Sequence, residues 1–220
     1  MHFHERAGLG KGATAAVPAK ASEAKRKKDA MKLHLAALAL LLSLSAAAHA
    51  RVIHIVAFGD SLTSGWLVPH AKAYPAQLQA ALRKKGHDVV VKNAGIAGDT
   101  TRHALDRFDI AIDPDTDICI VEFGINDRRT GVSLKTVRAR VAEIVRALRA
   151  RGIEVLLVGA GGLHFGDLAK AGGALYVEWK LPAHKYRARD GAHFNAEGYA
   201  ILVKRMLPQV ESLIERAARR

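Results

Sequence analysis

Cysteine, aromatic residues and long apolar runs are all scarce in this sequence. One of the 220 residues is cysteine, Cys119, so no intramolecular disulfide can form, and no Cys and His spacing indicates a structural metal site. Aromatic residues make up only 5% of the chain and are not interleaved with the basic residues, as a single-strand binding surface requires. We therefore expect no metal, no cofactor and no nucleic-acid partner.

The longest apolar run lies near the amino terminus. It begins after Met31 and Lys32, extends over residues 33–44 and leads into a small-residue segment that ends at Ala48 and Ala50. A basic start, an apolar core and small residues at the cleavage positions are typical of a secretory signal peptide, and the run is shorter than the roughly 20 apolar residues that span a bilayer. We predict a signal peptide at residues 31–50 and a periplasmic or secreted protein. The alternative is an uncleaved membrane anchor with an exported catalytic domain.

Residues 1–30 precede this segment and show no apolar period. They are rich in Ala, Gly and Lys, with a basic cluster at residues 25–28, and we predict a disordered basic extension. Translation starting at Met31 would remove it altogether. Residues 51–220 have the length of one domain and hold 26 Lys and Arg residues against 18 Asp and Glu residues, a net charge of +8. We expect a monomer with at most weak attraction to anionic membrane surfaces.

Apolar segments alternate with amphipathic ones through residues 51–220. Apolar, β-branched segments that end near glycine predict strands, and apolar residues at helical spacing predict helices. The predicted strands are 51–58, 89–91, 118–123 and 153–158, with a weaker fifth at 174–178, and the predicted helices are 74–85, 99–108, 133–152 and 195–214. This order predicts an α/β fold, a three-layer α/β/α sandwich around a mainly parallel sheet. Ligands bind at the carboxyl ends of the strands in such sheets.

Four polar segments fall at those strand ends or at a helix entry. Gly59-Asp60-Ser61-Leu62 follows the first strand, and Gly98 lies in the loop after the second. Gly124-Ile125-Asn126-Asp127 follows the third strand. Asp190-Gly191-Ala192-His193 precedes the last helix. Each segment alone is a common turn or helix cap, so the interpretation depends on their joint occurrence.

Together these segments supply the parts of a serine nucleophile site. Ser61 offers a hydroxyl, His193 could accept its proton, and Asp190 could hold the other ring nitrogen of His193. The backbone N–H groups of Ser61 and Gly98 and the side-chain amide of Asn126 could donate to a developing oxyanion. His164 is the strongest competing histidine, but only His193 has an aspartate three residues before it. Asp60, Asp99 and Asp127 are interpreted as turn or cap residues.

The four segments, in this order, resemble the SGNH or GDSL hydrolase family over nearly all of residues 51–210. The resemblance implies a flavodoxin-like SGNH hydrolase fold and a carboxylic ester hydrolase. It implies that Ser61, Asp190 and His193 are catalytic, with Ser61, Gly98 and Asn126 as the oxyanion hole. The nearest subgroup is the periplasmic multifunctional esterases, which act as arylesterase, thioesterase and lysophospholipase. The implied substrate is a small-molecule ester or lipid.

Three departures leave the substrate open. Ala97 stands where the subgroup has serine, Phe194 stands where it has proline, and residues 159–190 are shorter than its substrate-lining loop. The prediction is therefore an esterase for carboxylic esters, extending to thioesters or lysophospholipids. The alternatives are an acyl or acetyl transferase that acts on envelope glycans with the same residues, and an inactive envelope-binding domain.

Overall fold

The computed structural model describes residues 26–34, 51–180 and 183–220. Residues 35–50 of the predicted signal peptide lie outside this range. None of the helices in the three described segments is long and apolar enough to cross a membrane. Signal peptide, anchor and cleavage site remain predictions.

Residues 26–34 form a helix in which every residue is exposed. Residues 26–30 therefore differ from the disorder predicted for the basic extension. The segment consists mostly of Lys, Arg, Ala, Met and Leu, which are good helix formers, and it contains neither Gly nor Pro. Strong local propensity therefore favours a helix in this segment.

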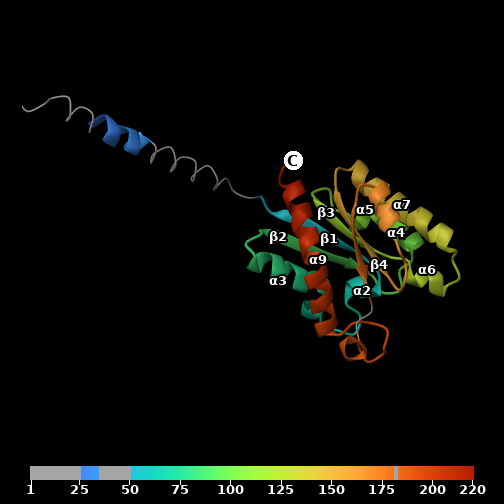
Figure 1. The fold of residues 1–220 in the computed structure, drawn as a ribbon. Coiled ribbons are helices and arrows are strands. Elements are labelled where there is room, and N and C mark those ends of the chain that lie inside the picture. Colours follow the sequence, from blue (N-terminus) through green and yellow to red (C-terminus); the bar gives the residue numbers. More distant parts are fainter. Residues whose placement is uncertain (1–25, 35–50, 181–182) are drawn as a thin grey trace, which may run out of the picture. The chain divides into compact units, whose positions relative to one another are not determined.

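A five-stranded parallel sheet forms the centre of residues 51–220, in the order β2-β1-β3-β4-β5 (Figure 1). This order is the doubly wound, flavodoxin-like arrangement, so the predicted fold class is confirmed. The weakly indicated fifth strand is present. The strands are β1 (Ile53–Gly59), β2 (Val89–Gly95), β3 (Ile118–Glu122), β4 (Glu154–Ala160) and β5 (Leu175–Trp179).

Helices cover both faces of the sheet. Alternate residues of β1 point to opposite sides, so that Ile55 packs with one group of helices and Val56 with the other. The first group consists of α3 (Tyr74–Lys84) and α9 (Ala196–Ala217). The second consists of α4 (Thr101–Asp106), α5 (Phe108–Ala111), α7 (Leu134–Ala150) and α8 (Gly166–Ala171).

The observed elements differ from the predicted ones at several points. β2 continues to Gly95 through polar residues, which an edge strand tolerates because one side of its backbone has no neighbouring strand. The predicted helix 99–108 is divided at Arg107, which turns back to bond Asp99 and the Gly59 carbonyl. Helix α8 was not predicted, because its six residues are too few to show a helical period.

Candidate active site

Ser61 is the first residue of a short helix, α2 (Ser61–Ser64), that begins where β1 ends. Asp60 caps this helix, and its Oδ1 accepts a hydrogen bond of 2.9 Å from the Leu62 N–H. Gly59 has to be glycine, because a Cβ there would lie 2.0 Å from Thr63 Oγ1 and 2.7 Å from the Glu122 carbonyl oxygen. The tight strand-to-helix turn therefore presents Ser61 at the carboxyl edge of the sheet.

His193 connects Ser61 to Asp190. Its Nε2 lies 2.8 Å from Ser61 Oγ, and its Nδ1 lies 2.5 Å from Asp190 Oδ2. Asp190 Oδ1 accepts from the backbone N–H groups of Ala192 and His193 at 3.1 and 3.0 Å. The hydrogen bonds from the His193 backbone and ring lower the pKa of Asp190 to about 2, so that this side chain is a carboxylate at neutral pH. The structure thus brings together the three residues that the sequence indicated.

The loop that carries Asp190 and His193 is held at both ends. Ala188 N–H donates to the His193 carbonyl oxygen at 2.8 Å, and Asn195 N–H donates to the Tyr186 carbonyl oxygen at 3.0 Å. Phe194 is 1% exposed and anchors the loop in the core. His193 is therefore held by main-chain bonds on one side and by a buried aromatic ring on the other.

Asn126 lies beside Ser61, at the start of α6 (Ile125–Arg129). Its amide nitrogen donates to Asp60 Oδ2 at 3.1 Å and to the Asp99 carbonyl oxygen at 2.9 Å, so both N–H groups are engaged. Donation to an oxyanion therefore requires Asn126 to release or share one acceptor. This competition was not expected from the sequence, because both acceptors come from other loops.

The other two expected donors are open. Among the described residues, neither the Ser61 nor the Gly98 backbone N–H has a hydrogen-bond acceptor. Gly98 is exposed, with φ of 86°, a conformation that favours glycine. It adjoins the Asp99 carbonyl that Asn126 contacts, but it does not line the cavity at Ser61. The structure therefore places Gly98 near Asn126 and leaves its N–H at the surface.

Glu122, at the end of β3, is a site residue that the sequence analysis missed. It is 1% exposed, as is Asp60, and its Oε2 accepts from Thr63 Oγ1 at 3.0 Å. Burial raises the pKa of Asp60 to about 6, and burial together with the nearby Asp60 raises the pKa of Glu122 well above its ordinary value. Both carboxyls therefore bind a proton more readily in the folded protein than in the unfolded chain. The available signal was an acidic residue in an otherwise apolar strand.

Glu122→Gln is expected to weaken the pH dependence of stability. The raised pKa values mean that the folded state holds protons that the unfolded chain releases near pH 4, so the free energy of unfolding of the parent falls as pH rises from about 4 through 6. A glutamine amide can donate to Asp60 without titrating. Urea unfolding at pH 4.5 and 8 should therefore show a smaller decline in the variant.

The control for this measurement is Glu143→Gln, which changes an exposed glutamate of α7. Its pH dependence should match that of the parent. An unchanged decline in the Glu122 variant would contradict the raised pKa of Glu122.

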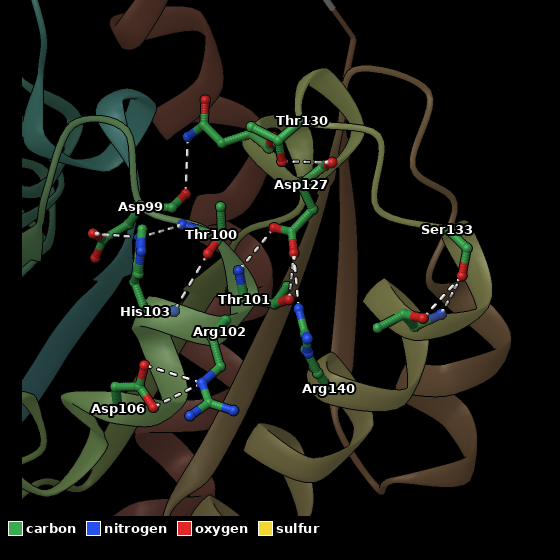
Figure 2. A network of polar contacts seen from close by, with 12 residues as sticks. Asp99, Thr100, Thr101, Arg102, His103, Asp106, Asp127, Thr130, Ser133 and Arg140 are labelled. Atoms are coloured by element: carbon green, nitrogen blue, oxygen red, sulfur yellow. Dashed lines mark hydrogen bonds and ion pairs between the residues drawn. The ribbon is translucent and has the colours of Figure 1, made fainter.

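Asp127 and Asp99 hold the loops around Asn126 (Figure 2). Asp127 is fully buried and accepts from Thr101 N–H at 2.8 Å and Thr101 Oγ1 at 2.6 Å, with Arg140 Nη1 at 3.7 Å. Asp99 pairs with Arg107 at 2.7 Å. Asp127 thus joins α6 to α4 and α7 and is not a helix cap. Asp99 closes a turn, with its N–H donating to the Ile96 carbonyl oxygen at 3.2 Å, which is one of the two roles expected for it, while Thr100 caps α4. Asp60, by contrast, caps a helix, α2, as predicted. It also forms the buried contacts described above.

The competing histidines lie elsewhere. His164, the strongest competitor, pairs with Glu178 at 3.5 Å, and His54 pairs with Asp115 at 3.2 Å. His193 is the histidine that contacts Ser61 in the part of the chain that the structure describes. No group of three or more His, Cys, Asp or Glu side chains is placed to hold a metal ion within residues 26–34, 51–180 and 183–220.

A cavity of about 180 Å³ opens beside Ser61. Phe194 forms part of the cavity wall. The Phe194 ring packs edge-to-face on Trp179, with the ring centroids 6.3 Å apart. The departure from proline at position 194 thus places an aromatic ring between the core and the cavity. The other lining residues are Asp60, Ser61, Leu62, Ile125, Asn126, Arg129, Ala160, Gly161, Ala192 and His193.

A serine, a histidine and an aspartate bonded in this order, at the carboxyl edge of a parallel α/β sheet, have the arrangement of the serine hydrolases. The chain belongs to the GDSL-like lipase/acylhydrolase family, whose model matches residues 57–180. The resemblance inferred from the four segments is therefore confirmed. The matched range contains Ser61, Gly98 and Asn126 and ends before Asp190 and His193.

Individual relatives agree with this assignment. An arylesterase of Vibrio mimicus is 33% identical over 105 residues, which are 47% of this chain and 52% of that protein. The chain spans about half the length of the curated relatives it matches. The crystal structure of AlinE4, an SGNH-hydrolase family esterase, has a TM-score of 0.59 and 31% identity over 74% of this chain and 96% of that one. The crystal structure of TesA, at 23% identity, has the same fold, with a TM-score of 0.67 over 73% of this chain and 99% of that one.

Proposed function

We propose that this protein is a serine esterase that hydrolyses carboxylic esters through an acyl-enzyme on Ser61. The observation that carries the proposal is the bridge formed by His193, 2.8 Å from the Ser61 hydroxyl and 2.5 Å from the Asp190 carboxylate. A nucleophile, a base and a group that orients the base are the minimum for this chemistry. Family membership and the arylesterase and AlinE4 likenesses support the same reaction.

In the first half-reaction, Ser61 Oγ bonds to the ester carbonyl carbon while His193 Nε2 takes its proton, and the carbonyl π electrons move to the oxygen. When the tetrahedral intermediate collapses, the bond to the leaving alkoxide breaks and His193 returns the proton to that oxygen. Water then repeats both steps on the acyl-enzyme, releasing the acid and restoring Ser61. Asp190 stays ionised throughout and stabilises the imidazolium.

The negative oxygen needs donors while it exists. The Ser61 and Gly98 backbone N–H groups are open for this role, and Asn126 joins them when its amide turns from Asp60. A single donor of this kind typically contributes about 10² to 10³ in kcat. The proposed oxyanion hole thus consists of Ser61, Gly98 and Asn126.

Aryl and alkyl esters are the proposed substrates, with thioesters and lysophospholipids as an extension of the same acyl chemistry. A periplasmic or secreted location remains part of the proposal and depends on the predicted signal peptide. Transfer of the acyl group to a glycan and a domain without turnover are the competing outcomes.

The experiment is hydrolysis of phenyl acetate by the purified protein, with and without an added sugar acceptor. We expect phenol and free acetate in equal amounts and little acetylated sugar. Acetate found mainly on the acceptor would establish a transferase instead. A folded protein that releases no phenol between pH 6 and 9 would support the inactive domain and contradict the esterase.

Acyl-chain length should show a short optimum. Each methylene buried beside Trp179 and Phe194 contributes about 0.8 kcal/mol, or roughly fourfold in kcat/KM, until the cavity is full. We expect kcat/KM for p-nitrophenyl esters to rise over the shortest chains and then to fall. Ala160→Val fills part of the cavity and should move the optimum to a shorter chain. A steady rise to the dodecanoate in both proteins would contradict this assignment.

A further inference from the structure

The carboxyl-terminal end of α6 carries two adjacent arginines at the mouth of the Ser61 cavity. Arg129 lines the cavity itself, together with Ser61 and His193. Arg128 and Arg129 also line a second, more open hollow. Ile125, Arg129 and Gly161 line both the cavity and this hollow. Arg129 therefore lies at the boundary between the cavity and the open hollow. An ester held at Ser61 can extend along this side toward both guanidinium groups.

Both arginines are exposed, and neither guanidinium group has an ion pair or hydrogen bond with any residue that the structure describes. Other arginines around the same face are occupied: Arg107 by Asp99, Arg138 by Asp167 and Arg140 by Asp127. The pair at α6 thus retains its full capacity to bind an anion from solution.

The acidic groups near the cavity are engaged with residues other than these two arginines. Asp190 is bonded to His193, and Asp99 to Arg107. Asp60 and Glu122 are buried, and they accept hydrogen bonds from Leu62 N–H and the Asn126 amide and from Thr63 Oγ1, respectively. The mouth of an otherwise largely apolar cavity therefore carries two guanidinium groups that form no ion pair with a residue that the structure describes. Guanidinium groups bind carboxylate and phosphate oxygens with paired, charge-assisted hydrogen bonds.

We propose that Arg129, with Arg128, binds an anionic group of the substrate, so that the protein prefers esters that carry a carboxylate or phosphate a few atoms from the reacting carbonyl. This inference rests on the proposed esterase function. Its simplest competitor is that the two side chains only stabilise the negative end of α6 as solvated surface arginines. That competitor makes no distinction between charged and neutral esters.

The test compares matched esters in the parent and in Arg129→Gln. On the acyl side, mono-(4-nitrophenyl) succinate is compared with 4-nitrophenyl pentanoate. On the alcohol side, 4-acetoxybenzoate is compared with 4-acetoxybenzamide. We expect Arg129→Gln to lower kcat/KM for the anionic member of at least one pair by about 10-fold and to leave its neutral partner within about twofold. Arg128→Gln should give a smaller loss of the same kind.

Arg146→Gln is the matched control, because Arg146 is also exposed on a helix but lines neither hollow. It removes the same charge and should leave both pairs unchanged. A loss confined to the succinate places the anion on the acyl side, and a loss confined to the benzoate places it on the alcohol side. The selective loss should shrink in 0.5 M NaCl, because exposed charge pairs are screened by salt.

Equal effects of Arg129→Gln on charged and neutral esters, or no effect on either, would overturn the anion site while leaving the esterase intact. A selective loss in Arg146→Gln would also overturn the anion site, because the change in the net charge of the protein would then explain the effect. Failure of the proposed function looks different, because the parent would hydrolyse none of the four esters. In that case both proposals fall.

Discussion

Ser61→Ala is expected to lower kcat for phenyl acetate by up to about 10⁶-fold, to within roughly 10³ to 10⁴ of the uncatalysed reaction. The hydroxyl of Ser61 is the atom that His193 Nε2 approaches at 2.8 Å, and alanine removes both the nucleophile and the acceptor of the acyl group. Only the remaining oxyanion donors and substrate binding would contribute to the residual rate acceleration of this variant. The measurement is initial rate against substrate concentration, with freshly purified protein.

Ser64→Ala is the matched control for this variant. It deletes a hydroxyl in the same short helix, one that bonds only the Ser61 carbonyl oxygen, at 3.2 Å. Its kcat should stay within about 10-fold of the parent, since a single neutral hydrogen bond contributes on the order of 1 kcal/mol. Equal losses in both variants would assign the effect to disruption of α2 rather than to a nucleophile.

Asp190→Asn has the second largest expected effect, a fall in kcat of about 10⁴-fold. Asparagine can still accept from the Ala192 and His193 backbone N–H groups through its oxygen, so the loop should keep its conformation. Its NH₂ group then faces His193 Nδ1 and donates to it. The ring proton is forced onto Nε2, and His193 can no longer accept the Ser61 proton.

Asp115→Asn provides the comparison, because it alters another aspartate–histidine pair, Asp115 with His54, outside the Ser61 site. Its kcat should equal that of the parent. Asp190→Asn should unfold in urea at pH 7 in one cooperative transition at a somewhat lower midpoint than the parent, because the stabilisation by the carboxylate is lost, and it should be fully folded in the absence of urea, which separates a tautomer effect from a folding effect. Full activity in Asp190→Asn would show that His193 needs no partner.

The pH dependence also bears on Asp190. Its pKa of about 2 means that the carboxylate persists in the folded protein far below neutral pH. The stability it contributes is present above the unfolded value near 3.9 and is lost as pH falls toward 2. A fall in activity on acidification that occurs well above pH 2 therefore reports the protonation of a group other than Asp190.

Much of the fold could be predicted because the signals are local. The strands are runs of apolar, β-branched residues that stop at glycine, and α7 shows a complete apolar face from Val137 to Leu148. Helix α8 and strand β5 fall in a glycine-rich segment where neither period repeats. Residues 26–30 were predicted as disordered because residues 1–30 show no apolar period, a pattern that does not register helix propensity.

The site was predictable to the extent that its residues form compact segments. Asp190 and His193 reach each other across one turn, so their spacing carried the geometry. The acceptors of Asn126, the buried partner of Asp60 and the position of Arg129 depend on how separate loops meet. Pairwise spacing along the chain cannot encode such contacts.

The most direct test of the central claim is the mass of the protein after reaction with a fluorophosphonate, followed by peptide mapping. The account requires one adduct per chain, located on Ser61, with fluoride as the leaving group and ester hydrolysis lost in proportion to labelling. Ser61→Ala should gain no mass, and Ser64→Ala should label as the parent does. An adduct on another residue, or an unlabelled parent that still hydrolyses esters, would contradict the assignment of Ser61 as the nucleophile.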